Sequence, residues 1–271
     1  MGSALFIVWR ESIEAVLIVG ILYAYLARFA EGRRGIKYLF VGVAGGVVAS
    51  LLLALAAVLI QEELSSRQLA YFETGAVLLA AVLMAQMVLW MARHAAKLTS
   101  ELHADMDKAM GSGSLLGVGL IAMVAVMREG SETVLYLYGL GLENTAGALP
   151  LFGSAALGFV LALVTAWAVS KGVRYLNYRL FFRVTGVLLL FSAAGLLVSG
   201  VSNLIAMGTL PALMEPVWNT SAILDSGSHF GGVVASFTGY RSQPSLMLVL
   251  SYALFWGVIL IFMKKRPSKK V

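Results

Sequence analysis

Two short charged strings lie inside long apolar stretches of this 271-residue sequence. The pattern Arg-Glu-x-x-Glu occurs at Arg10–Glu14 and again at Arg128–Glu132. An ionisable side chain near the middle of a membrane helix raises the insertion free energy by roughly 2.5–3.5 kcal/mol, so six of them raise it by about 15–20 kcal/mol before pairing. Residues this unfavourable are usually kept for function, and we expect these strings to form the functional site.

Helical spacing gives each string a defined chemistry, because its two Glu and its Arg are three or four residues apart and share one helix face. If the two faces meet, four carboxylates and two guanidiniums carry a formal charge of −2, which a cation or protons must balance. An all-oxygen site suits a hard cation such as ferric or ferrous iron, manganese or magnesium. Salt bridges that only join helices are the structural alternative. The predicted ligands are Glu11, Glu14, Glu129 and Glu132, with Arg10 and Arg128 as supporting counter-charges.

Composition predicts an all-α, polytopic membrane protein, since 60% of the residues are hydrophobic and only 13% are charged. A bilayer core about 30 Å thick takes about 20 helical residues to cross. Seven stretches meet that length, which predicts a single transmembrane domain over residues 1–271. They are Leu5–Ala27, Tyr38–Ile60, Tyr71–Ala92, Leu115–Leu142, Leu151–Ser170, Val184–Ala206 and Ser245–Met263.

The basic residues predict the orientation of these spans. Sixteen of the twenty Lys and Arg fall between spans one and two, three and four, and five and six, or in the C-terminal tail. The positive-inside rule then places the N-terminus outside and the C-terminus in the cytoplasm of a cell membrane. Because the charge is scattered over four segments, it is a topology signal and does not indicate nucleic-acid binding.

The two strings extend to a longer match, R-E-x-x-E-x-V-L, at a constant offset of 118 residues. This offset corresponds to three spans, so the two copies run in opposite directions and predict an inverted repeat of helices 1–3 and 4–6 plus a seventh helix. Such repeats place the transported species at their interface near the midplane, and movement of one repeat against the other exposes it inward. We expect repeat 1 at about 1–112, repeat 2 at about 113–206, an outer loop at 207–244 and helix seven at 245–263.

Several chemistries are excluded or weakened by missing residue types. There is no cysteine, so a bound metal must use oxygen or nitrogen, and the three His fall in expected loops. A His-liganded intramembrane metalloprotease is therefore disfavoured, as is a lipid-pyrophosphate phosphatase, which needs a Ser/Arg/Gly-rich phosphate loop. A proton-coupled carrier of an organic substrate stays open, and it would need a roomy pocket beside the strings.

The paired R-E-x-x-E helices resemble the oxidase-dependent iron permease family of fungi and bacteria. The third span also opens with the family's Phe-Glu pair, Phe72-Glu73, and the segment TSAILDSGSHFGGVVASFTGYRSQPS is similar to its S-x-x-L…G-Y-x-x-x-P-S stretch. The resemblance covers nearly the whole chain. One departure is Ser12, where the family usually has Gly, as the second string does at Gly130.

The resemblance implies a permease, not an enzyme, that imports iron, generally ferric, through the four Glu. Iron is then the transported substrate, with no permanent cofactor, and an extracytoplasmic iron-oxidising or iron-binding protein hands it over. Manganese, magnesium and lead are the alternative cations, and a Glu-dependent intramembrane enzyme is the alternative class. A homo-oligomer in the lipid bilayer stays open.

A few secondary residues are candidates as well as the four Glu. Glu73 lies near the outer end of the third span and either completes the site or faces the interface. In the outer loop, Glu215, Asp225 and His229 either receive iron from a partner or belong to a plain solvated loop. The stripe of Met84, Met87 and Met91 has helical spacing and is typical of packing.

Overall fold

The protein is built from helices throughout the part of the chain that the computed structural model describes, which is residues 2–28, 32–94, 98–111, 114–143, 148–170 and 178–264. No strand occurs in these ranges, so the all-α prediction is confirmed. The helices are α1 (Gly2–Leu26), α2 (Gly32–Glu63), α3 (Ser66–His94), α4 (Leu98–Gly111), α5 (Leu115–Glu143), α6 (Ala148–Ser170), α7 (Tyr178–Ala206), α8 (His229–Thr238) and α9 (Leu246–Lys264).

Five of these helices, α2, α3, α6, α7 and α9, are long and apolar enough to cross a membrane. They correspond to five of the seven expected spans. The other two, α1 and α5, have 25 and 29 residues, but every window of 18 residues in either contains all three charges of its motif. Large apolar side chains such as Leu51, Phe152 and Leu254 are exposed on the outer helices, as a lipid-facing surface requires.

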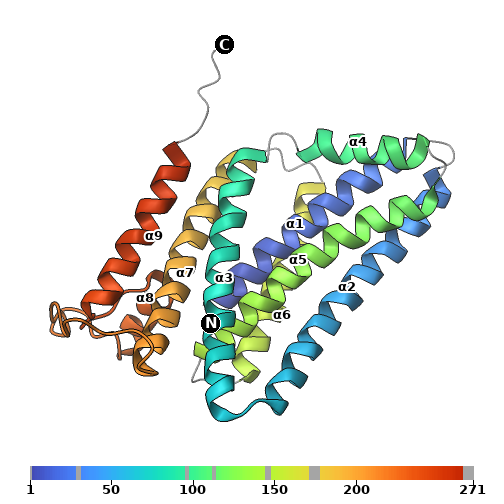
Figure 1. Ribbon diagram of the computed structural model, residues 1–271. Helices are drawn as coiled ribbons and strands as arrows, with labels where there is room; N and C mark the ends of the chain where they lie inside the picture. Colours follow the sequence, from blue (N-terminus) through green and yellow to red (C-terminus); the bar gives the residue numbers. More distant parts are fainter. Residues whose placement is uncertain are drawn as a thin grey trace.

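The long helices run in alternating directions (Figure 1). The helix α4 and the C-terminal end of α9 lie at one end of the bundle, while α8 and the turn between α2 and α3 lie at the opposite end. Within the expected outer loop, α8 is capped at its N-terminus by Ser228, whose side chain accepts a hydrogen bond from Gly231 N, and at its C-terminus by Gly239 with φ of 74°. The sequence did not predict this helix.

The short helix α4 packs across the ends of α1 and α5. Its Met106 and Ala109 are buried in one cluster with Leu22 of α1 and Val118 of α5. The Tyr25 hydroxyl of α1 also donates a hydrogen bond to the Asp107 carboxylate. The segment after the third span is therefore a separate helix that closes one end of the bundle.

The two motif helices each pack tightly against one neighbour, α5 against α2 and α1 against α6. Glycines allow the backbones to touch. A Cβ added at Gly46 of α2 would lie 2.7 Å from the Met123 oxygen of α5, and one added at Gly158 of α6 would lie 2.4 Å from the Leu5 oxygen of α1. Small residues at such contacts are what membrane helices use to approach closely.

We expect Gly158→Ala to destabilise the protein, because its new methyl group must push the backbone of α1 away. Overpacking of this kind lowers the free energy of unfolding by about 1–3 kcal/mol. The measurement is the midpoint of thermal unfolding in detergent. The matched control is Gly153→Ala on the same helix, where an added Cβ meets nothing within 4 Å; equal midpoints for the two variants would contradict the close packing of α1 and α6.

Candidate metal-binding site

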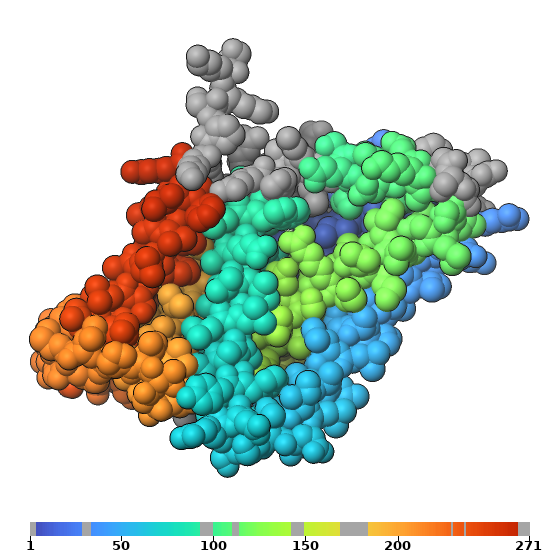
Figure 2. Space-filling model, viewed as in Figure 1, coloured from blue at the N-terminus to red at the C-terminus, as the bar shows by residue number. Residues whose placement is uncertain are grey.

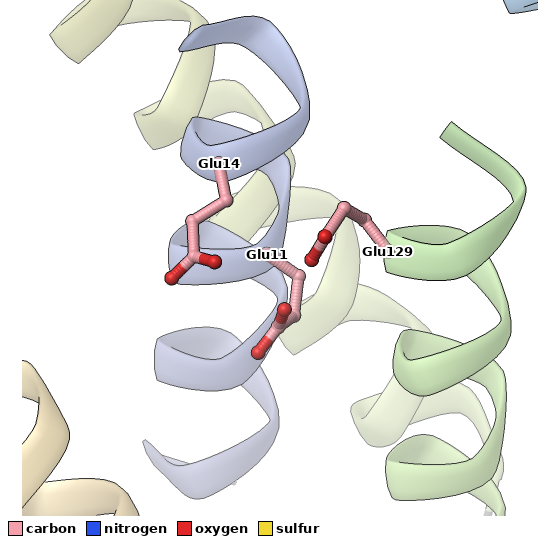
Figure 3. A group of neighbouring side chains, drawn as sticks. All are labelled: Glu11, Glu14 and Glu129. Carbon is pink, nitrogen blue, oxygen red and sulfur yellow. The ribbon is translucent and has the colours of Figure 1, made fainter. Parts of the chain in front are cut away.

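The motif helices α1 and α5 place three carboxylates together. Glu11, Glu14 and Glu129 each offer an oxygen that lies within 4.8 Å of the others. In Figure 3, Glu129 extends from α5 toward α1, where Glu11 and Glu14 occupy successive turns. All three side chains are buried, at 1%, 5% and 5% exposure. This is a set of hard oxygen donors from two helices, and it can hold a single cation.

Arg10 is the buried counter-charge of this cluster. Its guanidinium lies 2.8 Å from Glu11 Oε1 and 2.5 Å from Glu14 Oε1, and it also donates to the sulfur of Met87 of α3 at 3.1 Å. The arginine itself is 1% exposed. A planar guanidinium suits this arrangement because it can bind two carboxylates at once.

The cluster keeps unused binding capacity after this pairing. Glu11 Oε2 and Glu129 Oε2 are buried oxygens without a hydrogen-bond partner. Unpaired charge in a buried place is strongly unfavourable. A cation between the three carboxylates would satisfy these oxygens, which are buried and have no hydrogen-bond partner.

Glu132, the fourth predicted ligand, lies outside this group of three. Its Oε1 is 3.2 Å from Arg128 Nε, and its Oε2 accepts a hydrogen bond of 3.1 Å from the Tyr136 hydroxyl. Arg128 is 42% exposed and stacks over the Trp90 ring of α3 at 4.6 Å. The structure thus brings three of the four Glu together and holds the fourth beside them by other contacts.

Sequence reasoning missed three residues that touch the motifs. Met87 belongs to the stripe interpreted as packing, yet it also accepts from Arg10. Tyr136, fully buried, lies four residues after Glu132, and that helical spacing was a usable signal. Trp90 gave no sequence signal, because its contact with Arg128 depends on how α3 packs against α5.

The secondary candidates lie apart from the three grouped carboxylates. Glu73 on α3 is partly buried and lies close enough to the Tyr138 hydroxyl of α5 to interact electrostatically. In the outer segment, Glu215 and Asp225 are exposed, and Asp225 Oδ1 accepts a local hydrogen bond from Gly227 N at 3.0 Å. The side chain of His229 lies outside the described residues. Roles for these residues stay predictions.

The glycine inside the second motif has a structural reason. A Cβ at Gly130 would lie 2.2 Å from the hydroxyl and 2.8 Å from the Cβ of Ser50 on α2. Ser50 is buried and donates to the Gly46 carbonyl one turn earlier. Any side chain at position 130 would therefore displace α2 from the motif helix.

The sequence model of the iron permease FTR1 family matches residues 1–269. The chain belongs to the iron permease FTR1 family. The resemblance inferred from the motifs is thereby confirmed, and this FTR1 family member is a multi-pass membrane transporter, not an enzyme. No known solved structure matches the chain at a significant level.

Two curated relatives of this FTR1 family member are both named ferrous iron permease EfeU. The protein of Escherichia coli O6:H1 is 32% identical over 260 residues, which cover 94% of this chain and 91% of the relative. The protein of Yersinia pestis is 30% identical over 269 residues, which cover 97% of this chain and 93% of the relative. The similarity is therefore not confined to the motif helices.

We expect Arg10→Lys to destabilise the protein more than Arg128→Lys. A lysine at position 10 cannot bind both carboxylates. Losing a charge-assisted hydrogen bond to a buried group lowers the free energy of unfolding by about 1.5–3 kcal/mol. At position 128 the ion pair is partly exposed, and its loss lowers the free energy of unfolding by at most about 1 kcal/mol. Thermal unfolding of both variants in one detergent measures the difference; a larger effect at position 128 would contradict the geometry.

Proposed function

We propose that this FTR1 family member imports iron across the cell membrane through one site formed by Glu11, Glu14 and Glu129, which Glu132 completes as the cation moves. The observation that carries the proposal is the buried group of three carboxylates from two helices. One guanidinium is bound among them, and two of their oxygens have no hydrogen-bond partner. Intramembrane ionisable groups of this kind mark ion pathways.

Charge balance supports a divalent cargo. The three grouped carboxylates and Arg10 sum to a formal charge of −2, and adding the Glu132–Arg128 pair leaves this sum unchanged. Ferrous iron would neutralise the site, whereas ferric iron would leave a positive charge in a place of low dielectric. We therefore propose ferrous iron as the form that occupies the site. The motif resemblance had implied ferric iron, but the relatives are named ferrous iron permeases, which supports the ferrous form.

An organic substrate is less well supported than a cation. The discriminating feature is a roomy pocket beside the motifs. A cavity of about 610 Å³ lies between α3, α7 and α9. Trp90, which contacts Arg128, is among its lining residues, but no residue of either motif lines it. Manganese and magnesium carry the same charge as ferrous iron, so the experiment must separate them.

We also propose that α1 and α5 cross the bilayer, giving seven spans with the N-terminus outside and the C-terminus in the cytoplasm. Both are as long as the apolar spans, and their charged residues pair with each other instead of facing lipid. The end of the bundle where α4 lies carries basic residues of four helix ends or connections. These are Arg28, Arg34, Lys37, Lys108 and Lys264.

Helix packing supports the inverted repeat. The second helix of each expected repeat packs on the first helix of the other, as α2 does on α5 and α6 does on α1. The glycine contacts agree in detail. A Cβ at Gly46 would meet Met123 O and Met127 N, and a Cβ at Gly158 would meet Leu5 O and Trp9 N. The residues met in α1 and α5 differ by the same offset of 118 as the motifs.

The same relation gives an account of Ser12. One turn after Gly46, Ser50 contacts Gly130. One turn after Gly158 the corresponding residue is Ala162, which is fully buried, and the equivalence places it opposite Ser12. In one pair the hydroxyl lies on the neighbouring helix, as Ser50 opposite Gly130. In the other pair it lies in the motif, as Ser12 opposite Ala162. Ser12 is then a packing substitute for glycine and not an additional ligand.

Close backbone contacts suggest which helices move together. They join α1 with α6 and α2 with α5, whereas the carboxylates lie where α1 meets α5. We propose that the α1–α6 pair moves against the α2–α5 pair, which opens the site to one side or the other. Each moving pair thus takes one helix from each repeat, unlike the expected motion of whole repeats.

Cross-linking tests this motion, since the chain has no cysteine and any introduced pair is unique. A short, reducible bifunctional thiol reagent would join Gly45→Cys to Met123→Cys, which lie within the α2–α5 pair, or Ile18→Cys to Ala122→Cys, which lie between α1 and α5 in one buried cluster. We expect the first cross-link to leave transport largely intact. The second should stop it until the link is reduced. Transport that survives the second link would contradict the proposed motion.

Metal uptake into proteoliposomes tests the function itself. Ferrous iron, ferric iron, manganese and magnesium are offered separately to the wild-type protein and to Glu129→Gln. We expect ferrous uptake that falls at least about tenfold in the variant, because one charged ligand is lost from a buried site. The matched control is Glu63→Gln at the exposed end of α2, which should transport normally. Normal iron uptake by Glu129→Gln would refute the site.

A further inference from the structure

The two motif arginines adopt different arrangements although their strings are the same. Arg10 has a side chain 2% exposed and lies within 2.8 Å of both Glu of its motif. Arg128 has a side chain 42% exposed, lies 3.2 Å from Glu132 and stays 3.9 Å from Glu129. Both strings are helical, so the spacing of the residues does not account for the difference.

The neighbouring helix α3 supplies a different partner to each arginine. Met87 accepts a hydrogen bond from Arg10, and Trp90, three residues later, lies under the guanidinium of Arg128 at 4.6 Å from the ring centre. Residues three apart share a helix face, so one face of α3 contacts both motifs. A tryptophan face is the strongest aromatic partner for a cation.

The first motif shows what such an arginine does without an aromatic face, which is to bind both of its carboxylates. If Arg128 did the same, its guanidinium would occupy Glu129, whose Oε2 is now without a hydrogen-bond partner. The site would then carry a second internal cation in competition with the transported one.

We propose that Trp90 is a positioning residue that holds Arg128 away from Glu129 and so keeps this carboxylate available to the cation. The inference rests on the proposed function, because it assigns Glu129 to the cation site. The partial exposure of the Arg128 side chain agrees with a hollow in the molecular surface. In Figure 2, part of α1 is visible in a hollow that α3, α4 and α5 border.

The test is equilibrium binding of ferrous iron under reducing conditions, with manganese in parallel, to the purified full-length protein in detergent. We expect Trp90→Leu to weaken ferrous binding about tenfold, because losing a cation–π contact frees Arg128 to compete. Trp90→Phe keeps an aromatic face and should bind within about threefold of wild type. Thermal unfolding of each variant identifies any that does not fold.

A second background separates positioning from a general packing role. Arg128→Gln removes the competing guanidinium, and its own affinity for iron is the reference value in this second background. Adding Trp90→Leu to it should cause no further loss. An equal loss from Trp90→Leu in both backgrounds would overturn the proposal. A folded wild-type protein that binds no iron would instead refute the proposed function.

Discussion

The structure is organised around negative charge placed where a bilayer would exclude water. Three carboxylates from two helices are buried within a few ångströms of one another, and a single buried guanidinium is bound among them. Such an arrangement is stable only if the surrounding helices fix it and something balances the remaining charge. Two features of the packing follow from this constraint. Glycines let α5 approach α2 and α1 approach α6, and one face of α3 contacts both arginines.

Both motifs contribute to the cluster, but their roles differ. The first motif supplies two of its three carboxylates and the buried counter-charge. The second supplies Glu129, while its Glu132 and Arg128 lie beside the cluster. Glycine contacts join α5 to α2 and α1 to α6 in a similar way, whereas α3 gives the two arginines different partners, Met87 and Trp90. A site with a fixed part and an adjustable part suits a cation that must be held and then released.

Local sequence pattern predicted the helices and the motif chemistry, because apolar length and three- or four-residue spacing are properties of one helix at a time. The meeting of Glu11 and Glu14 with Glu129 followed from the repeat offset. Contacts that depend on packing between distant helices were not predictable, as with Trp90 under Arg128 or Ser50 against Gly130. The sequence also did not predict α4 and α8 as separate helices, because such short segments lack the apolar length that identified the spans.

The central claim is that two motifs form one cation site, and the stoichiometry of iron binding tests it most directly. We expect wild-type protein to bind one ferrous ion per chain, since the cluster spans both helices. Glu11→Gln and Glu129→Gln should each remove that binding completely, although they lie in different motifs. If each motif bound its own ion, wild type would bind two per chain and each variant would keep one, and the account of a shared site would be wrong.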